Sequence, residues 1–173
     1  MTFWQQLQDV VSKIDWGLVT GIIALIFTAI SLQVQRKHNR LSVKPIALVS
    51  VGDYENELAV HLQNKGTGPL IIKSLSFIDQ NGKTEKAIID FFGSDFKNVV
   101  WSTFVADIDG WTILPNETKT LIKLNGDSAD KEFVRVRDKV RKVLAQIQVE
   151  LLYQDIYEKD MPKKIRKLDW FAR

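Results

Sequence analysis

The sequence predicts a mainly β (α+β) fold, an antiparallel β-sandwich or open barrel, preceded by one N-terminal transmembrane helix. Three observations predict it. Residues 16–35 carry no charged side chain, and a helix of about 20 residues spans about 30 Å, the hydrocarbon thickness of a bilayer. From residue 46 onward, short segments alternate apolar and polar side chains, as half-buried strands do. Turn signals recur between these segments, which is typical of antiparallel sheets.

Four parts follow along the chain. Apolar side chains at helical spacing predict an amphipathic helix over residues 1–15. It is an interfacial helix on the outer leaflet, a polar extension of the membrane helix, or a plain anchor. The transmembrane helix covers residues 16–35, and a basic juxtamembrane hinge covers residues 36–45. The β-rich domain covers residues 46–173.

The charges that flank the apolar stretch predict its orientation. The basic side chains that follow it are Arg36, Lys37, Arg40 and Lys44. Before it, Lys13 is opposed by Asp9 and Asp15. The positive-inside rule therefore places the C-terminal domain in the cytoplasm and the N-terminus outside. A cleaved signal peptide is the alternative, but its first region would be acidic in side chains and its cleavage site poor.

Small and weakly polar residues recur along one face of the transmembrane helix. This seam comprises Gly17, Gly21, Ala24, Thr28, Ser31 and Gln35. Small residues let helices approach closely in lipid, and hydroxyl groups can bond between helices. The seam predicts a homo-oligomer, a tetramer for example, and in a stronger interpretation the lining of an ion channel. Chance is the alternative, because these residue types are common in membrane helices.

The strands expected in the domain follow the alternating segments. They cover residues 46–51, 57–63, 70–79, 85–92, 111–114, 118–124, 145–154 and 163–170. Asn81-Gly82 predicts a type I′ hairpin turn over residues 80–83. A short helix capped by Ser94 or Asp95 is expected within residues 93–104, and a longer helix capped by Asp127 or Ser128 over residues 128–142.

Composition excludes several classes of chemistry. The chain has no cysteine and two histidines, which excludes disulfides, thiol nucleophiles and Cys-rich or His-rich metal sites. The net charge is +3 and the domain is nearly neutral, so a duplex-DNA binder is not suggested. No nucleophile motif, phosphate-binding loop or zinc motif occurs. We therefore expect neither an enzyme nor a cofactor.

Three minor candidates have simpler interpretations. His61 could contact a ligand, Asp107 and Asp109 could hold a metal or act as an acid–base pair, and the glycine-rich segment 64–69 could bind an anion through its backbone N–H groups. A satisfied histidine, a solvated turn and an ordinary glycine turn explain the same residues. We prefer these simpler interpretations.

The most suggestive pattern is a row of basic residues on the expected helix 128–142. This basic stripe comprises Lys131, Arg135, Lys139 and Lys142, with Arg137 and Arg141 to the side. Such a row can meet several phosphates, and a symmetric oligomer would bring several rows together. It predicts binding of a nucleotide or short oligonucleotide. The alternatives are a solvated face, partly paired to Glu132 and Asp138, and a helix resting on anionic lipid.

Two segments and the overall layout resemble known proteins. NKGTGPLIIKSLSF (residues 64–77) and LPNETKTL (residues 114–121) resemble strand–turn–strand signatures of Ig-like β-sandwiches. The layout resembles small membrane effectors of bacterial antiviral signalling, such as the cyclic-oligoadenylate-responsive membrane proteins of type III CRISPR systems. This resemblance implies a bacterial inner-membrane oligomer that changes membrane permeability in antiviral defence when a nucleotide signal binds. The alternative is a passive membrane-anchored scaffold that docks a partner protein, for example one encoded in the same operon.

Overall fold

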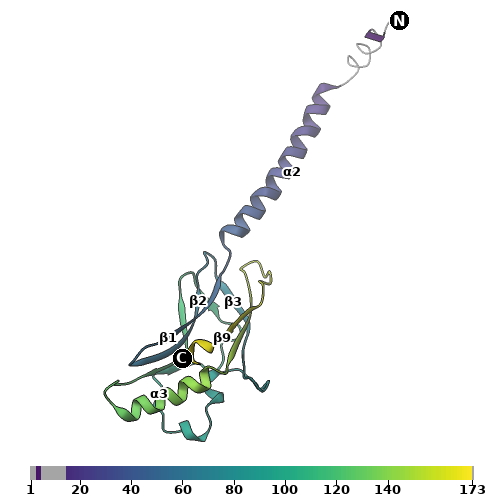
Figure 1. The fold of residues 1–173 in the computed structure, drawn as a ribbon. Helices are drawn as coiled ribbons and strands as arrows, with labels where there is room; N and C mark the ends of the chain where they lie inside the picture. The colour runs from purple at the N-terminus through teal and green to yellow at the C-terminus, as the bar shows by residue number, and fades with distance from the viewer. Residues whose placement is uncertain (1–2, 5–14, 173) are drawn as a thin grey trace. The chain divides into compact units, whose positions relative to one another are not determined.

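The computed structural model describes residues 3–4 and 15–172. It divides the chain into two compact units, residues 1–41 and residues 42–173 (Figure 1). The amphipathic helix expected over residues 1–15 falls almost entirely outside the described residues.

The first unit is dominated by helix α2 (Trp16–Ser42), which is long and apolar enough to cross a membrane. Asp15 stands at its start, and its carboxylate accepts a hydrogen bond from the Leu18 N–H at 3.1 Å, as a helix cap does. None of the described helix residues is buried. The helix continues through residues 36–42, which the sequence had suggested as part of a hinge.

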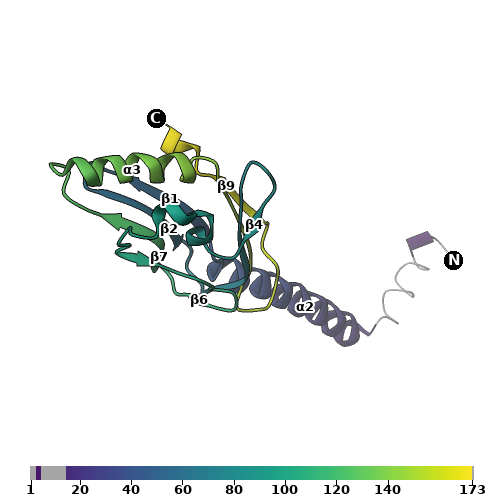
Figure 2. The same ribbon diagram turned by 90° about the horizontal axis from the view of Figure 1, so that it is seen from below.

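The second unit is a β-sandwich, which confirms the predicted fold class (Figures 1 and 2). Both of its sheets are antiparallel. In order across the first sheet, the strands are β1 (Ala47–Asp53), β2 (Glu57–Asn64), β7 (Thr118–Asn125) and β5 (Thr103–Phe104). The second contains β4 (Thr84–Glu85), β3 (Leu70–Ile78), β8 (Gln148–Gln154) and β9 (Lys164–Lys167), with β6 (Thr112–Ile113) beside the start of β3.

The core lies between the two sheets and follows the predicted alternation. On β2, Leu58, Val60 and Leu62 are each no more than 1% exposed. On β8, Val149 and Leu151 are fully buried. Burying side chains of this size contributes about 1.5–3 kcal/mol each. The described core residues all belong to the second unit, so this unit has a hydrophobic core of its own.

Three expectations about local structure were wrong. Of the strand expected over residues 85–92, only Glu85 pairs with β3, and the 3₁₀ helix η1 (Ile88–Phe91) follows. Its apolar side chains are consecutive, and this compact turn packs them together against the core. The turn at residues 80–83 has positive φ only at Gly82, so it is not type I′, and the Asp79 carboxylate accepts hydrogen bonds from two N–H groups within it.

The third wrong expectation concerns the residues that cap two helices. Helix α3 (Lys131–Leu144) begins after Asp130, whose carboxylate accepts from the Glu132 N–H at 2.8 Å, because Asp127 is used in the preceding turn. The helix expected within residues 93–104 is the 3₁₀ helix η2 (Ser94–Phe96), which has no side-chain cap. A last 3₁₀ helix, η3 (Asp169–Ala172), ends the described chain.

The strand registers define two ends of the sandwich. We call the end at which β1 begins, next to α2 in the sequence, the proximal end, and the opposite end the distal end. At the proximal end, Ala47 of β1 pairs with Asn64 of β2, and β8 finishes at Gln154 opposite Ile71. At the distal end, Glu57 of β2 pairs with Asn125 of β7. Helix α3 connects β7 to β8 at the distal end, where it contacts the β1–β2 turn (Figures 1 and 2).

The buried side chain of Asn64 fixes the proximal end. Its carbonyl oxygen accepts from the N–H groups of Ile46 (3.2 Å) and Gly66 (2.9 Å). Its amide donates to the carbonyls of Gly68 (2.8 Å) and Ile113 (3.0 Å). One fully buried amide therefore joins the segment before β1, the loop after β2 and strand β6.

The glycines of the loop that follows Asn64 are required by close backbone packing. A Cβ atom on Gly66 would overlap the Lys44 carbonyl, and one on Gly68 would overlap the Val43 carbonyl. The N–H groups of Lys65, Gly66 and Thr67 all donate within the protein. The loop has no row of free N–H groups for an anion, so the turn interpretation of residues 64–69 holds.

We predict that Asn64→Ala lowers the free energy of unfolding by about 3 kcal/mol or more, because several buried polar groups lose their partner. The measurement is urea denaturation of the full chain in detergent, followed by tryptophan fluorescence. Asn98→Ala, at an exposed asparagine, is the control and should change stability little. Equal stability of the two variants would contradict the role given to the Asn64 amide.

Candidate functional site

Helix α3 carries the predicted basic stripe and is held against the sandwich by its apolar face. Val140 and Leu144 are buried, and Phe133, Val136 and Val143 pack partly buried against the core. A Cβ atom at Gly126 would overlap the Phe133 ring, so this glycine lets the chain pass close to the helix. The apolar side chains of α3 therefore face the sandwich, and the opposite face of α3 is left to solvent.

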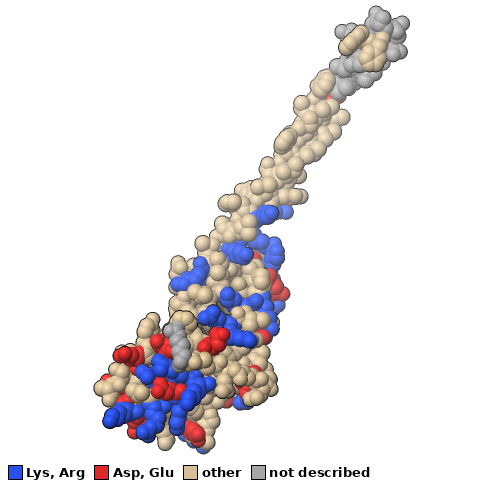
Figure 3. Space-filling view, viewed as in Figure 1, with Lys and Arg blue, Asp and Glu red and all other residues tan. Residues whose placement is uncertain are grey.

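The four stripe residues lie on that solvent-facing side. Lys131, Arg135, Lys139 and Lys142 are all exposed. Within the described part of the chain, none of their side chains has an ion pair or hydrogen bond. Steps of four residues along a helix advance about 6 Å. Figure 3 shows basic side chains gathered over this end of the domain, with acidic ones between them.

The two arginines beside the stripe have a different role. Arg141 contacts the Asp53 carboxylate through Nε (2.8 Å) and Nη2 (2.5 Å), and the Asp53 side chain is only 7% exposed. Arg137 donates to the Glu55 carbonyl at 2.6 Å. Asp138, which was expected to pair with the stripe, instead contacts Arg137 and Arg141 at 3.2 Å. These arginines therefore attach α3 to the β1–β2 hairpin.

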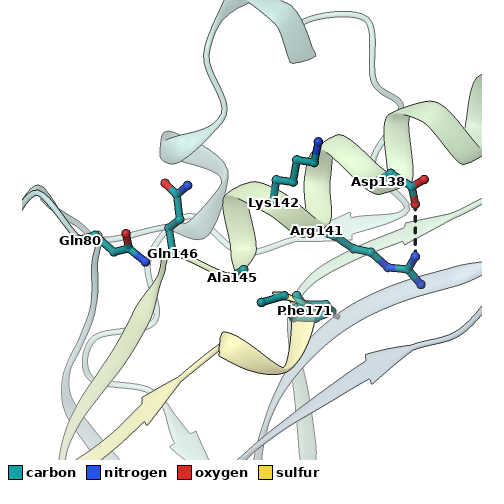
Figure 4. A pocket seen from close by; sticks show the side chains of 8 residues that line it. Gln80, Asp138, Arg141, Lys142, Ala145, Gln146 and Phe171 are labelled. Carbon is teal, nitrogen blue, oxygen red and sulfur yellow. Dashed lines mark hydrogen bonds and ion pairs between the residues drawn. The ribbon is translucent and has the colours of Figure 1, made fainter.

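A pocket opens where the stripe ends. Its volume is about 650 Å³, within the range typical of small-molecule sites (Figure 4). It is lined by Gln80, Asp138, Arg141, Lys142, Ala145, Gln146, Phe171 and Ala172. A second recess of about 410 Å³ shares Gln80, Ala145 and Gln146 with it. Lys142 belongs both to the stripe and to the pocket.

The pocket was not predicted from the sequence. Gln80, Gln146 and Phe171 come from three segments far apart in the chain, and no local pattern connects them. Figure 4 shows the Gln80 and Gln146 side chains on one side of the pocket and Phe171 on another. Two of the lining residues, Arg141 and Lys142, lie in the last turn of α3, where the helix dipole stabilises cations.

The minor candidates from the sequence have structural partners. His61 Nδ1 lies 3.1 Å from the Thr120 hydroxyl, and burial lowers the pKa of this imidazole. Burial opposes ionisation of Asp109, but hydrogen bonds from Lys86 and from the Leu75 N–H outweigh it and hold the pKa of Asp109 below its usual value. Asp107 accepts from the Asp109 N–H at 2.9 Å, as a turn residue does. Among the described residues, no three His, Cys, Asp or Glu side chains gather as metal ligands would.

The predicted seam of the apolar helix lies along α2, and all six of its residues are exposed in the single chain. A Cβ atom at Gly21 would have no neighbour within 4 Å, so nothing in this chain's described residues requires a glycine there. The Thr28 hydroxyl donates to the Ala24 carbonyl at 2.7 Å, and its hydrogen is therefore already used within the helix.

No protein-family model matches the chain, and no curated protein matches it significantly. The functional argument therefore rests on the residues and their geometry.

We predict that Arg141→Gln destabilises the domain by about 2 kcal/mol, because it leaves the nearly buried Asp53 carboxylate without its main partner. Adding Asp53→Asn should recover part of this loss, so the two changes together should cost less than their sum. The measurement is a double-mutant cycle by urea denaturation of the full chain in detergent. Lys142→Gln, at the adjacent exposed position, is the control; strict additivity would show that Arg141 and Asp53 do not stabilise each other.

Proposed function

We propose that this chain is a single-pass membrane protein whose cytoplasmic β-sandwich binds a phosphate-rich ligand, a nucleotide or short oligonucleotide, on the basic stripe of α3. The observation that supports this proposal is that the six basic residues of this helix differ in whether they have partners within the domain. Arg137 and Arg141 have acidic or carbonyl partners, whereas the four stripe residues have none among the described residues. The bound ligand would supply the missing negative charge.

The spacing of the stripe supports this proposal. Lys131, Arg135 and Lys139 are successive i,i+4 neighbours with the same charge. Such pairs destabilise a helix by about 0.2–0.5 kcal/mol each. A polyanion along the helix would remove this repulsion and gain charge-assisted hydrogen bonds. The pocket beside Lys142 would receive a further part of the ligand at the end of the stripe.

The membrane part of the proposal concerns the response to binding. In this proposal the seam of α2 holds a homo-oligomer, and ligand binding changes how the membrane helices pack and thereby the permeability of a bacterial inner membrane. The layout resemblance to antiviral effectors supports this direction. The proposed function includes no catalytic step.

We predict that Arg135→Glu together with Lys139→Glu weakens ligand binding on the order of 100-fold, because two charge-assisted contacts become repulsive. The measurement is thermal unfolding of the full chain in detergent against a panel of cyclic and linear oligonucleotides and inorganic polyphosphate. A ligand that binds the folded state raises the unfolding temperature with its concentration. The control is Lys97→Glu with Arg166→Glu, which reverses two exposed charges outside α3.

The two possible outcomes separate the hypotheses. A shift that survives Arg135→Glu/Lys139→Glu would place the ligand elsewhere on the domain. No shift with any compound would contradict ligand binding and favour the scaffold function.

One observation favours the scaffold as a second candidate. Strand β1 stands at the edge of its sheet, and no other described strand pairs with its outer side. Its sequence ALVSVGD is apolar with a single charge at the end. Such an edge can accept an added strand from a partner protein. A scaffold requires no ligand and would tolerate replacement of residues 16–35 by another single-pass helix.

We predict that Gly21→Leu dissociates the oligomer in detergent, because added bulk on the seam separates helices that pack through small residues. Light scattering coupled to size exclusion measures the mass of the complex. Ala29→Leu places the same side chain off the seam and is the control. An unchanged mass in Gly21→Leu would remove the seam from the assembly.

A further inference from the structure

The loop between β8 and β9 presents two large side chains on a well-formed turn at the proximal end. The Asp155 side chain is buried, and its carboxylate accepts from the N–H groups of Tyr157 and Lys159, both at 2.9 Å. Glu158 completes the turn with φ of 58°. Ile156 and Tyr157 are nevertheless each 53% exposed at its tip. The turn thus displays an apolar and an aromatic side chain that the fold does not bury.

A second turn, between β6 and β7, presents a similar residue. Leu114 is 58% exposed, and its N–H donates to the Glu117 carboxylate at 2.8 Å. The hydrogen bond from Lys119 lowers the pKa of Glu117, so this carboxylate stays charged within the turn. The Asn116 N–H donates to the Asn64 carbonyl at 2.8 Å, which attaches the turn to the proximal end. β6 and β8 flank the start of β3 on opposite sides, so the two turns lie at the same end of the sheet.

Several exposed lysines belong to the same end of the domain. Lys44, Lys65 and Lys159 are exposed and have no acidic partner among the described residues. The acidic groups nearby are largely neutralised: Glu117 pairs with Lys119, and Asp160 pairs with Lys73. Glu158 is an exposed acidic residue that is not neutralised in this way. The balance at the proximal end is therefore positive around an apolar centre.

Only a short segment of chain connects this end of the domain to the apolar helix. Residues 36–42 continue α2 beyond its apolar stretch and add about 10 Å of helix. The headgroup layer of one leaflet is about 5–7 Å thick. Only residues 43–46 then separate α2 from β1, and the Lys44 and Ile46 carbonyls accept from the loop after β2. The proximal end is the part of the domain nearest to the membrane along the chain.

We propose that the proximal end of the domain is a lipid-binding face for an anionic leaflet. Ile156, Tyr157 and Leu114 insert among the headgroups, and Lys44, Lys65 and Lys159 contact lipid phosphates. Aromatic side chains favour this interface, and lysines near an anionic surface are attracted to it. The face rests on α2 spanning the membrane, as in the proposed function, but not on any ligand of α3.

The absence of cysteine from the sequence allows a direct test, because one introduced cysteine is the only thiol. The full chain is reconstituted into phosphatidylcholine vesicles with or without phosphatidylglycerol. Tyr157→Cys and Leu114→Cys carry an environment-sensitive fluorophore. Val100→Cys is the matched control, because Val100 is apolar, 85% exposed and precedes β5, which pairs with the distal half of β7. Phe27→Cys, within α2, reports separately on membrane insertion.

The expected result is at least twofold less quenching by a neutral aqueous quencher, acrylamide, at positions 157 and 114 than at position 100 in the anionic vesicles. Changing Lys44, Lys65 and Lys159 together to Glu should abolish this protection. If positions 157 and 114 are as accessible as position 100 while position 27 is shielded, the proposal of a lipid-binding face is wrong, but α2 is inserted in the membrane as proposed. Accessibility at position 27 as well overturns both. Protection that is equal without phosphatidylglycerol overturns the assignment of anionic headgroups.

Discussion

The hydrogen bonds of the Asn64 side chain determine how the β-sandwich begins. This amide belongs to the first sheet, yet it bonds to Ile113 in the second sheet and to the segment that precedes β1. A buried amide with four partners cannot be replaced by an apolar group without leaving those partners unsatisfied. The two loop glycines are part of the same arrangement, because only residues without a Cβ let the backbone of residues 43–44 come so close. The position at which the chain joins the domain is therefore specified by a few polar contacts rather than by the apolar core.

The function proposed for α3 depends on a distinction that charge counting does not make. Six basic residues occupy one helix, and the sequence ranks them only by spacing. The structure separates Arg137 and Arg141, which attach the helix to the β1–β2 hairpin, from four cations that face solvent. A helix held in this way presents its remaining charges in a fixed row. Such preorganisation lowers the entropy lost when a polyanion binds.

The sequence predicted most of the fold, because alternation along β2, β3 and β8 reports directly which face of a strand is buried. It failed at residues 85–92, where consecutive apolar side chains form a 3₁₀ turn rather than a strand. It identified the basic stripe from helical spacing, but not the pocket beside it. Gln80, Gln146 and Phe171 meet only because the β3–β4 turn, the end of α3 and the C-terminal η3 converge in space. The exposure of Ile156 and Leu114 likewise could not be predicted from the sequence, because an isoleucine or leucine next to a strand can equally be buried in the core.

The β1–β2 hairpin connects the two ends of the domain. Its distal turn holds Arg141 and Arg137 of α3, and its proximal strand end carries Asn64. The basic stripe and the lysines around the proximal turns share no residue and no loop. Over evolution, substitutions could therefore change what is bound at one end without altering the other, provided that this hairpin is kept. Sequences that diverge from this one should vary most at the four stripe positions of α3 and at the exposed tips of the β6–β7 and β8–β9 turns, and least along β2.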